Sequence, residues 1–397
     1  MAEAAPTPPP TGPAVVVSSP GAAGVFSSGP AGASSSGPAG ASPPGREPRT
    51  RAAGRGRLPV TLVALSVTLV VSVLAGIALG PTVVPPGDVV RFLYAALTGG
   101  AIGADEVTGY SIVWHVRTPR VLLAAVVGAG LSVVGVAIQA LVRNALADPF
   151  VLGISSGASV GATAVVVFGI FAGLGVFALS AAAFLGALGA TVLVYLAARG
   201  PLGLTPLRLV LTGVALAYGF QALMSVLVFL APNGQAARTM LFWLLGSLGS
   251  ASWESLPLVA GAVLAAVVVL LRQSRSLDVL SLGDETAASL GVDADALRRG
   301  LFVLTAAVTG LIVAVSGAIG FVGLVLPHVV RIWVGSTHRR VLAVAPLAGA
   351  CFMVWVDLVA RTAFAPEELP LGVITALIGV PVFVVLMRRR GYLFGGR

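Results

Sequence analysis

The stretch "SLGDETAASLGVDADALRR", residues 281–299, places six charged side chains in nineteen positions of a chain that is otherwise poor in charge. Long runs of Val, Ala, Leu and Gly lie on both sides of it. Charged groups are costly to place in lipid, so this stretch is expected to face water. The contrast with its neighbours predicts a membrane protein that carries a structured polar connector.

The composition of the whole chain supports this interpretation. Of 397 residues, 57% are hydrophobic and 10% are charged, and the mean hydropathy is +1.00. Soluble globular chains carry about 25% charged residues. The apolar runs are continuous, and no series of short alternating strands is visible. The predicted fold class is therefore an all-α integral membrane protein.

Ten apolar segments are near the length that a bilayer requires. They are residues 58–80, 118–141, 151–171, 174–198, 207–231, 255–272, 300–317, 320–335, 341–363 and 370–388. With ten spans both termini lie on one side, and nineteen of the 24 cationic residues fall on that side. The five on the other side are Arg91, Arg117, Arg120, Arg238 and Arg361. This bias places both termini and residues 281–299 in the cytoplasm.

Two glycine-containing runs suggest how the spans pack. "GAGLSVVGVA", residues 128–137, and "SSGASVGATA", residues 155–164, place small residues at helical spacing. Small residues allow helix backbones to approach closely in lipid. We therefore expect these two spans to make close helix–helix contacts.

Residues 1–57 have a different composition from the rest of the chain. They are rich in Pro, Gly, Ala and Ser and end in "REPRTRAAGRGR", which holds five arginines. Such a segment buries too little apolar surface to offset chain entropy, so we predict a disordered cytoplasmic extension. It lacks the positive start and apolar core of a signal peptide. The membrane domain is then residues 58–397.

The absence of lysine limits the functions open to the chain, since every cationic side chain is arginine. A P-loop needs a lysine on the nucleotide phosphates, so no Walker A motif is present. If ATP drives this protein, another subunit must bind it.

No metal site or cofactor is expected. The one cysteine, Cys351, lies in an apolar run, and His328 has no second ligand nearby in the sequence. No nucleophile elbow, HExxH motif or pair of carboxylates lies in a span, which argues against an intramembrane enzyme. We also expect no nucleic-acid partner.

The polar connector itself has helix signals. Asp284 and Glu285 suit a first helical turn, Gly291 suits the position after a helix end, and Asp293 suits a second N-cap. The predicted order is helix, glycine turn, helix, with a small apolar surface formed by Ala287, Ala288, Leu290 and Leu297. A solvated connector does not need two capped helices, so we interpret the stretch as a docking element for a cytoplasmic partner.

Four motifs resemble those of one known family. "LGDETAASLGV" (282–292) followed by "LRR" (297–299) is similar to the coupling loop of FecCD-type permeases. These are the membrane subunits of type II ABC importers for iron-siderophores, haem and vitamin B12. Residues 117–159 resemble the family's second-span signature, "SGAIGFVGLVLPHVVR" (316–331) its glycine-rich motif, and residues 357–383 its closing signature. The resemblance runs from about residue 58 to the C-terminus.

The resemblance implies an assembly and a function. Two copies of the permease, or one copy and a paralogue, would join two ABC ATPase subunits and an external solute-binding lipoprotein in a bacterial cytoplasmic membrane. The ATPase would dock on the cytoplasmic coupling loop, about residues 273–299. The residues implied at this contact are Gly283, Asp284, Glu285, Ala288, Leu290, Gly291, Val292, Leu297 and Arg298. Iron-siderophore is the substrate we expect, and haem and cobalamin stay open.

Three arginines on the outer side are candidates for a second contact. Arg117 and Arg120 flank Pro119 at the start of a span, where the topology rule does not explain them. They either snorkel to the interface or form a cationic patch. The resemblance implies that they and Arg361 meet glutamates of the binding protein. Asp357 lies four residues before Arg361, so an intramolecular pair is an alternative for that arginine.

The translocation path and gate are expected in two segments. "QALVRNALADP" (139–149) and the following turn supply Gln139, Asn144, Ser155 and Ser156. Gln139 either lines the path or makes an interhelical hydrogen bond, and both readings stay open. The resemblance implies an inner gate at Thr205, Pro206 and Leu207. Proline and leucine depart from the small polar residues of the family, so the position of the gate carries over better than its chemistry.

A secondary transporter driven by an ion gradient is the alternative from another class. It requires ionisable groups at mid-membrane, and Asp357 is the only carboxylate that comes close. The feature that distinguishes the two is the connector at 281–299, for which a secondary transporter has no use.

Overall fold

The computed structural model describes residues 57–200 and 203–389, and these residues form helices joined by short connections. The predicted extension at 1–57 lies outside the described residues, apart from Arg57. The ten predicted spans each correspond to one helix. These are α1 (Arg57–Ala78), α4 (Thr118–Val142), α5 (Ile154–Phe168), α6 (Ala178–Ala198), α7 (Pro206–Phe229), α9 (Leu256–Arg272), α12 (Ala294–Ser316), α13 (Val322–Val334), α14 (His338–Thr362) and α15 (Leu371–Arg389).

The helices differ in how completely they cross a bilayer. Seven are long and apolar enough to span it, and α9 joined to α10 (Ser274–Leu280) across a 63° bend makes an eighth candidate. The other two, α5 and α13, are apolar but shorter. About ten spans was therefore a sound prediction of apolar helices, although a full-length crossing is clear for fewer of them.

Several helices were not predicted. The first connection holds α2 (Pro86–Thr98) and α3 (Val107–Ser111), and a π-helical turn at Ile112–Arg117 joins α3 directly to α4. A further helix, α8 (Gly234–Leu244), follows α7 and begins at Asn233, whose side chain accepts a hydrogen bond from the backbone N–H of Ala236. A single turn of 3₁₀ helix occurs at Pro149–Leu152, and 3₁₀ structure kinked at Gly175 occurs at Ala172–Phe177. The continuous helix Val107–Val142 thus extends well beyond the predicted span at 118–141.

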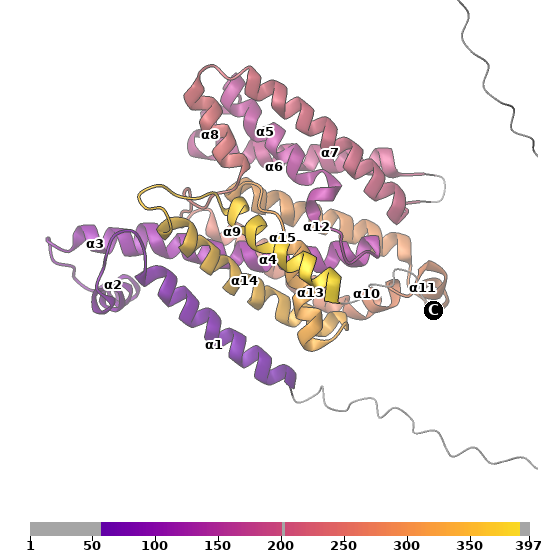
Figure 1. The fold of residues 1–397 in the computed structure, drawn as a ribbon, viewed down its shortest axis with the longest axis horizontal. Coiled ribbons are helices and arrows are strands. Elements are labelled where there is room, and N and C mark those ends of the chain that lie inside the picture. The colour runs from indigo at the N-terminus through magenta and orange to yellow at the C-terminus, as the bar shows by residue number, and fades with distance from the viewer. Residues whose placement is uncertain (1–56, 201–202, 390–397) are drawn as a thin grey trace, which may run out of the picture. The chain divides into compact units, whose positions relative to one another are not determined.

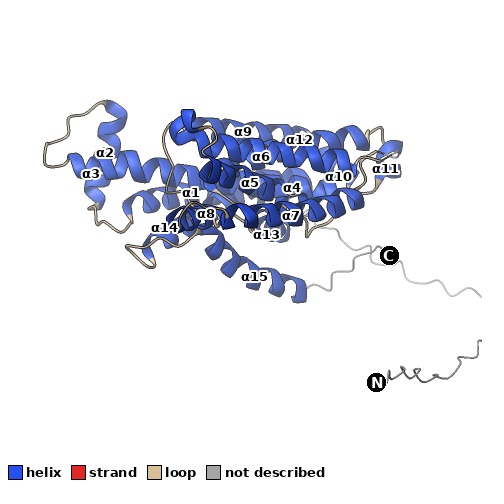
Figure 2. Cartoon of the chain, turned by 90° about the horizontal axis from the view of Figure 1, so that it is seen from above, coloured by secondary structure: helices blue, strands red, loops and turns tan. Residues whose placement is uncertain are grey.

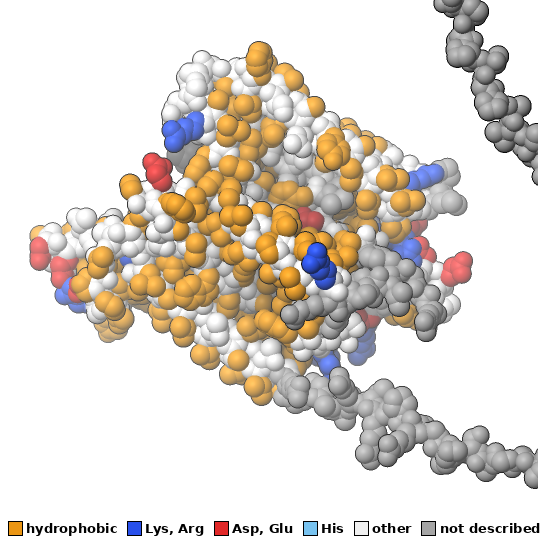
Figure 3. All heavy atoms as spheres, in the orientation of Figure 1, with side chains coloured by type: hydrophobic (Ala, Val, Ile, Leu, Met, Phe, Trp, Pro, Cys, Tyr) orange, Lys and Arg blue, Asp and Glu red, His pale blue; other side chains and the backbone are white. Residues whose placement is uncertain are grey.

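The short helices lie at opposite ends of the membrane domain. Figures 1 and 2 place α2 and α3 at one end, and α10 with α11 (Asp284–Ser289) at the other. Hydrophobic side chains are spread over the whole face in Figure 3, and charged ones are few. The arginine bias predicts that α10 and α11 face the cytoplasm and that α2 and α3 face outward, and this orientation stays a prediction.

Helix α4 is the centre of the packing, because it contacts α14, α13, α12 and α9 and is buried along most of its length. Its glycines allow this. A Cβ on Gly128 would lie 2.1 Å from the carbonyl oxygen of Gly349 in α14, and a Cβ on Gly135 would lie 2.0 Å from that of Gly323 in α13. Gly157 and Gly161 of α5 meet α6 equally closely. The predicted close contacts of both glycine-containing runs are confirmed.

Candidate functional site

The polar connector is built from two capped helices, as its sequence predicts. Helix α11 ends in a Schellman motif, in which the N–H of Gly291 bonds to Ala288 O at 3.0 Å and that of Val292 to Ala287 O at 2.8 Å. Gly291 has φ +78°, a left-handed conformation that favours glycine. The Asp293 carboxylate then accepts from the N–H of Ala296 at 2.9 Å and caps α12. The turn is therefore fixed at both ends.

Replacing Gly291 with alanine is expected to destabilise the connector by about 1–2 kcal/mol, because a Cβ is unfavourable at positive φ. No atom lies within 4 Å of the added Cβ, so the effect is of the backbone alone. The measurement is the free energy of unfolding in detergent. Gly300→Ala is the control, since Gly300 is helical, also has open space, and is expected to gain roughly 0.5–1 kcal/mol. Equal effects of the two substitutions would contradict the strain argument.

Asp284 ties this connector to the membrane helices. Its carboxylate forms an ion pair with Arg298 of α12, whose side chain is almost fully buried, and lies 3.5 Å from the guanidinium of Arg143 at the end of α4. Arg298 also lies 3.9 Å from Asp295. Because α11, α12 and α4 meet at one carboxylate, a displacement of α11 is transmitted to two spans.

The exposed surface of the connector is smaller than predicted. Ala287 is fully buried, so the prediction that it forms part of the apolar surface is wrong. Its side chain points inward because the short helix packs on the ends of the spans. Leu297 is half-buried against the core, and its part in the exposed surface stays a prediction. Glu285, Ala288 and Leu290 are exposed, and Leu290 is 60% exposed. Gly283, in the N-cap position with φ +115°, precedes this face.

A surface hollow of about 530 Å³ joins the connector to the predicted gate segment. Leu204 and Thr205 line it together with residues of α11 and the start of α12. Gly203 has φ +80°, and a Cβ there would lie 2.4 Å from the Asp295 carboxylate. Pro206 begins α7 and Leu207 is exposed. Of the predicted gate residues, Thr205 thus adjoins the connector, and the role of all three in gating stays a prediction.

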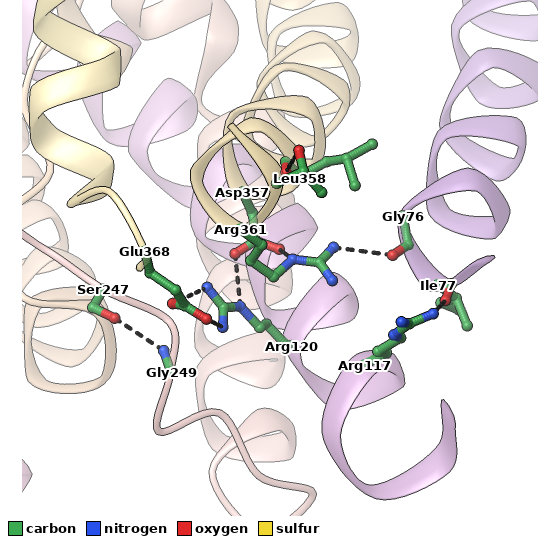
Figure 4. Close-up of polar contacts among 11 residues, drawn as sticks. Gly76, Ile77, Arg117, Arg120, Ser247, Gly249, Asp357, Leu358, Arg361 and Glu368 are labelled. Carbon is green, nitrogen blue, oxygen red and sulfur yellow. Dashed lines mark hydrogen bonds and ion pairs between the residues drawn. The ribbon is translucent and has the colours of Figure 1, made fainter. Parts of the chain in front are cut away.

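The three outer arginines are buried and bonded within the chain (Figure 4). Arg120 binds both carboxylate oxygens of Glu368 at 2.8 Å and donates to Asp357 at 2.8 Å. Asp357 also pairs with Arg361 at 2.9 Å, which confirms the intramolecular pair suggested by their spacing. Arg361 donates to the carbonyl of Gly76 at 3.0 Å. This network joins α4, α14, α1 and the segment before α15.

Arg117 bonds the end of α1. Its guanidinium donates to the carbonyls of Ile77 and Ala78, at 3.1 and 3.0 Å, and to that of Thr82. The carbonyls of Ile77 and Ala78 are ones that a helix end leaves without intrahelical partners, and Thr82 follows in the connection after α1. The expected contact of Arg117, Arg120 and Arg361 with a binding protein stays a prediction. In this conformation the three side chains that such a contact would use already bond to other groups of the same chain.

The path residues divide between packing and turn formation. The Gln139 amide donates to the carbonyl of Leu324 at 3.2 Å and accepts from Arg331 at 2.6 Å, so it makes the interhelical hydrogen bonds of the second alternative, between α4 and α13. The Asn144 side chain accepts from the N–H of Leu146, and Asp148 accepts from that of Phe150. Burial raises the pKa of the Asp148 carboxyl to about 6.

Ser155 and Ser156 occupy the first turn of α5, as predicted. Ser155 is buried, and its hydroxyl has no hydrogen-bond partner among the described residues. Ser156 is half-buried. Their place on a possible path stays a prediction.

Comparison with known proteins identifies the family. The model of the FecCD transport family matches residues 68–389. The chain is 38% identical over 326 residues to the uncharacterised ABC transporter permease YvrB of Bacillus subtilis, which covers 81% of this chain and 91% of that protein. It is 41% identical over 283 residues to the hemin transport system permease HmuU of Yersinia pestis, covering 70% and 84%.

A solved structure agrees. A chain described as an inward-facing conformation of a metal-chelate type ABC transporter superposes with a TM-score of 0.73 at 33% identity, covering 84% of this chain and 100% of that one. The fold and the connector therefore define a multi-pass membrane permease of the ATP-binding-cassette importers. The chain belongs to the FecCD transport family.

Proposed function

We propose that this permease imports a metal chelate, most simply an iron-siderophore, using ATP that separate ATPase subunits bind at the connector 284–299. Permeases of this family work with ATPase subunits and a binding protein. The chain has no Walker A lysine, so it holds no P-loop of its own. It needs no cofactor, and the functional unit includes a second permease copy or a paralogue.

The observation that carries the proposal is the geometry of the connector. An exposed face of Glu285, Ala288 and Leu290 sits on a helix that Asp284 holds to Arg143 and Arg298. Helix α12 continues from it into one span, and α10 leads through a 63° bend into α9. Closure of the ATPases would move α11 and tilt these spans, which opens or closes the path.

The ion-coupled alternative loses its main candidate residue. Asp357 is fully buried and is already paired with Arg120 and Arg361. A carboxylate that already bonds two guanidinium groups of the same chain is not free to bind and release a transported ion. The fixed network supports a structural role for this carboxylate.

Co-purification with ABC ATPase subunits from the same genome tests the proposal. Leu290→Asp and Glu285→Arg are expected to weaken ATPase binding by more than about tenfold, because each places a charge or a reversed charge in the contact. Asp284 is a poor probe, since its substitution would break the internal ion pairs as well.

Leu230→Asp is the matched control, because Leu230 is similarly exposed but follows α7 at the opposite end of the domain. Its complex is expected to stay intact. A wild-type permease that is stable and binds no ATPase would overturn the proposal. Uptake of labelled iron-siderophore, haem and cobalamin by cells carrying the complete transporter then distinguishes the substrates.

A further inference from the structure

A second hollow, of about 470 Å³, lies at the junction of α9, α10 and α14. It is lined by Leu271, Arg272, Ser274, Arg275 and Arg339. Arg272 ends α9, Arg275 is in the first turn of α10, and Arg339 is in the first turn of α14. Three cationic side chains from three helices therefore converge at the cytoplasmic end of a span.

The hollow has no countercharge of its own. Among the residues that the structure describes, Arg272, Arg275 and Arg339 make no ion pair, and all three are exposed. The carboxylate of α10, Asp278, accepts from the N–H of His338 at 2.9 Å and lies 2.7 Å from its imidazole Nδ1. That contact holds the start of α14 against α10 and draws Asp278 away from the arginines.

An apolar surface leads into the same hollow from the membrane side. Leu264 and Val268 of α9 are 65% and 38% exposed, and Leu271 lines the hollow itself. Their spacing of four and three residues places them on one face of the helix. This face covers the last two turns of α9 and ends at the arginines, because Arg272 is the last residue of α9.

We propose that the hollow formed by Leu271, Arg272, Ser274, Arg275 and Arg339 binds an anionic phospholipid of the cytoplasmic leaflet. The phosphate is held by the three guanidinium groups, which favour phosphate oxygens in bidentate geometry. An acyl chain lies along Leu264 and Val268. Basic pockets between helices on the cytoplasmic side are typical sites for anionic headgroups.

The apolar face argues for a lipid over an acidic protein segment. A peptide that bound the arginines would gain nothing from Leu264 and Val268, which lie farther into the membrane. A lipid satisfies both parts, with its headgroup at the interface and its chain on α9. The bound lipid would bridge α9, α10 and α14 at the base of the connector. Binding is independent of the ATPase, so the site stands apart from the proposed function.

Native mass spectrometry of the full chain in detergent, titrated with phosphatidylglycerol or phosphatidylcholine, tests the site. The wild type is expected to bind phosphatidylglycerol more tightly. Each arginine contributes about fivefold, so the triple variant R272Q/R275Q/R339Q is expected to lose on the order of 100-fold in that affinity. Binding of phosphatidylcholine is expected to change little.

The control is R199Q/R208Q/R388Q, which removes the same charge from exposed arginines on the same membrane side. An equal loss in the control would show a general surface potential and would overturn the site. If inorganic phosphate alone raised the thermal midpoint of the wild type as much as phosphatidylglycerol does, that would also overturn the site. The apolar face would then contribute nothing to binding. The thermal midpoint of each variant in phosphatidylcholine shows whether the variant is folded. If the triple variant is not folded, the single variant R275Q is used in its place.

Discussion

Replacing Gly135 with alanine is expected to disrupt the packing of α4 against α13 and to lower the yield of folded protein sharply. The added Cβ would lie 2.0 Å from the carbonyl oxygen of Gly323 and 2.7 Å from its Cα. Both are backbone atoms, so no side-chain rotation relieves the clash and the helices must separate. Overpacking of a tight core costs typically 1–3 kcal/mol, and a contact with rigid backbone lies at about the upper end.

The measurement is the thermal midpoint of the purified permease in detergent, together with the amount inserted in the membrane. Gly261→Ala in α9 is the matched control, because no atom lies within 4 Å of its added Cβ. It is expected to be neutral or slightly stabilising. A Gly135→Ala protein as stable as this control would mean that α4 and α13 are not in the close contact described.

The spans were predictable because the bilayer acts as a uniform solvent, and a continuous apolar run has few alternatives to a helix there. The helices that were not predicted, such as α2 and α8, fall in the connections between the predicted spans. α2 has 13 residues and α8 has 11, and both are amphipathic helices in connections. Their signals are local, such as Pro86 at the start of α2 and the αL Gly99 after it.

In the connector, the sequence predicts the helix caps but not the contacts between distant segments. The caps at Gly291 and Asp293 depend on neighbouring residues, so spacing alone revealed them. The pairing of Asp284 with Arg143 joins segments far apart in the chain, and no periodicity reports it. Ala287 faces inward for the same reason, because the surface that covers it comes from other helices.

The outer arginines also show that helical spacing predicts local pairs but not partners far apart in the chain. The pair Asp357–Arg361 follows helical spacing and was foreseen. Glu368 was missed as the bidentate partner of Arg120, although the run "PEELP" (366–370) places carboxylates beside the last span. Four of the five arginines predicted on the outer side, Arg91, Arg117, Arg120 and Arg361, bond to groups of the chain itself. Such internal bonds give these arginines a structural reason to lie against the charge bias of the topology.

Replacing Asp357 with asparagine is expected to destabilise the permease by about 3–5 kcal/mol, because it leaves buried guanidinium groups without their shared countercharge. The carboxylate is fully buried and is the only group that joins Arg120 to Arg361 in the network of Figure 4. Arg120 keeps Glu368, but among the described residues Arg361 retains only its hydrogen bond to the carbonyl of Gly76. The unpaired charge of Arg361 should therefore dominate the loss.

A second substitution separates this charge effect from simple loss of packing. The double variant D357N/R361M removes the charge that Asp357 neutralised, so it is expected to recover a large part of the stability lost in Asp357→Asn. Glu367→Gln is the control, since Glu367 is exposed beside the network and its loss is expected to be within about 0.5 kcal/mol of neutral. Denaturant unfolding of the four proteins in one detergent measures all three differences. A double variant less stable than Asp357→Asn would show that Arg361 stabilises the fold through Gly76 and packing, and that its charge needs no buried partner.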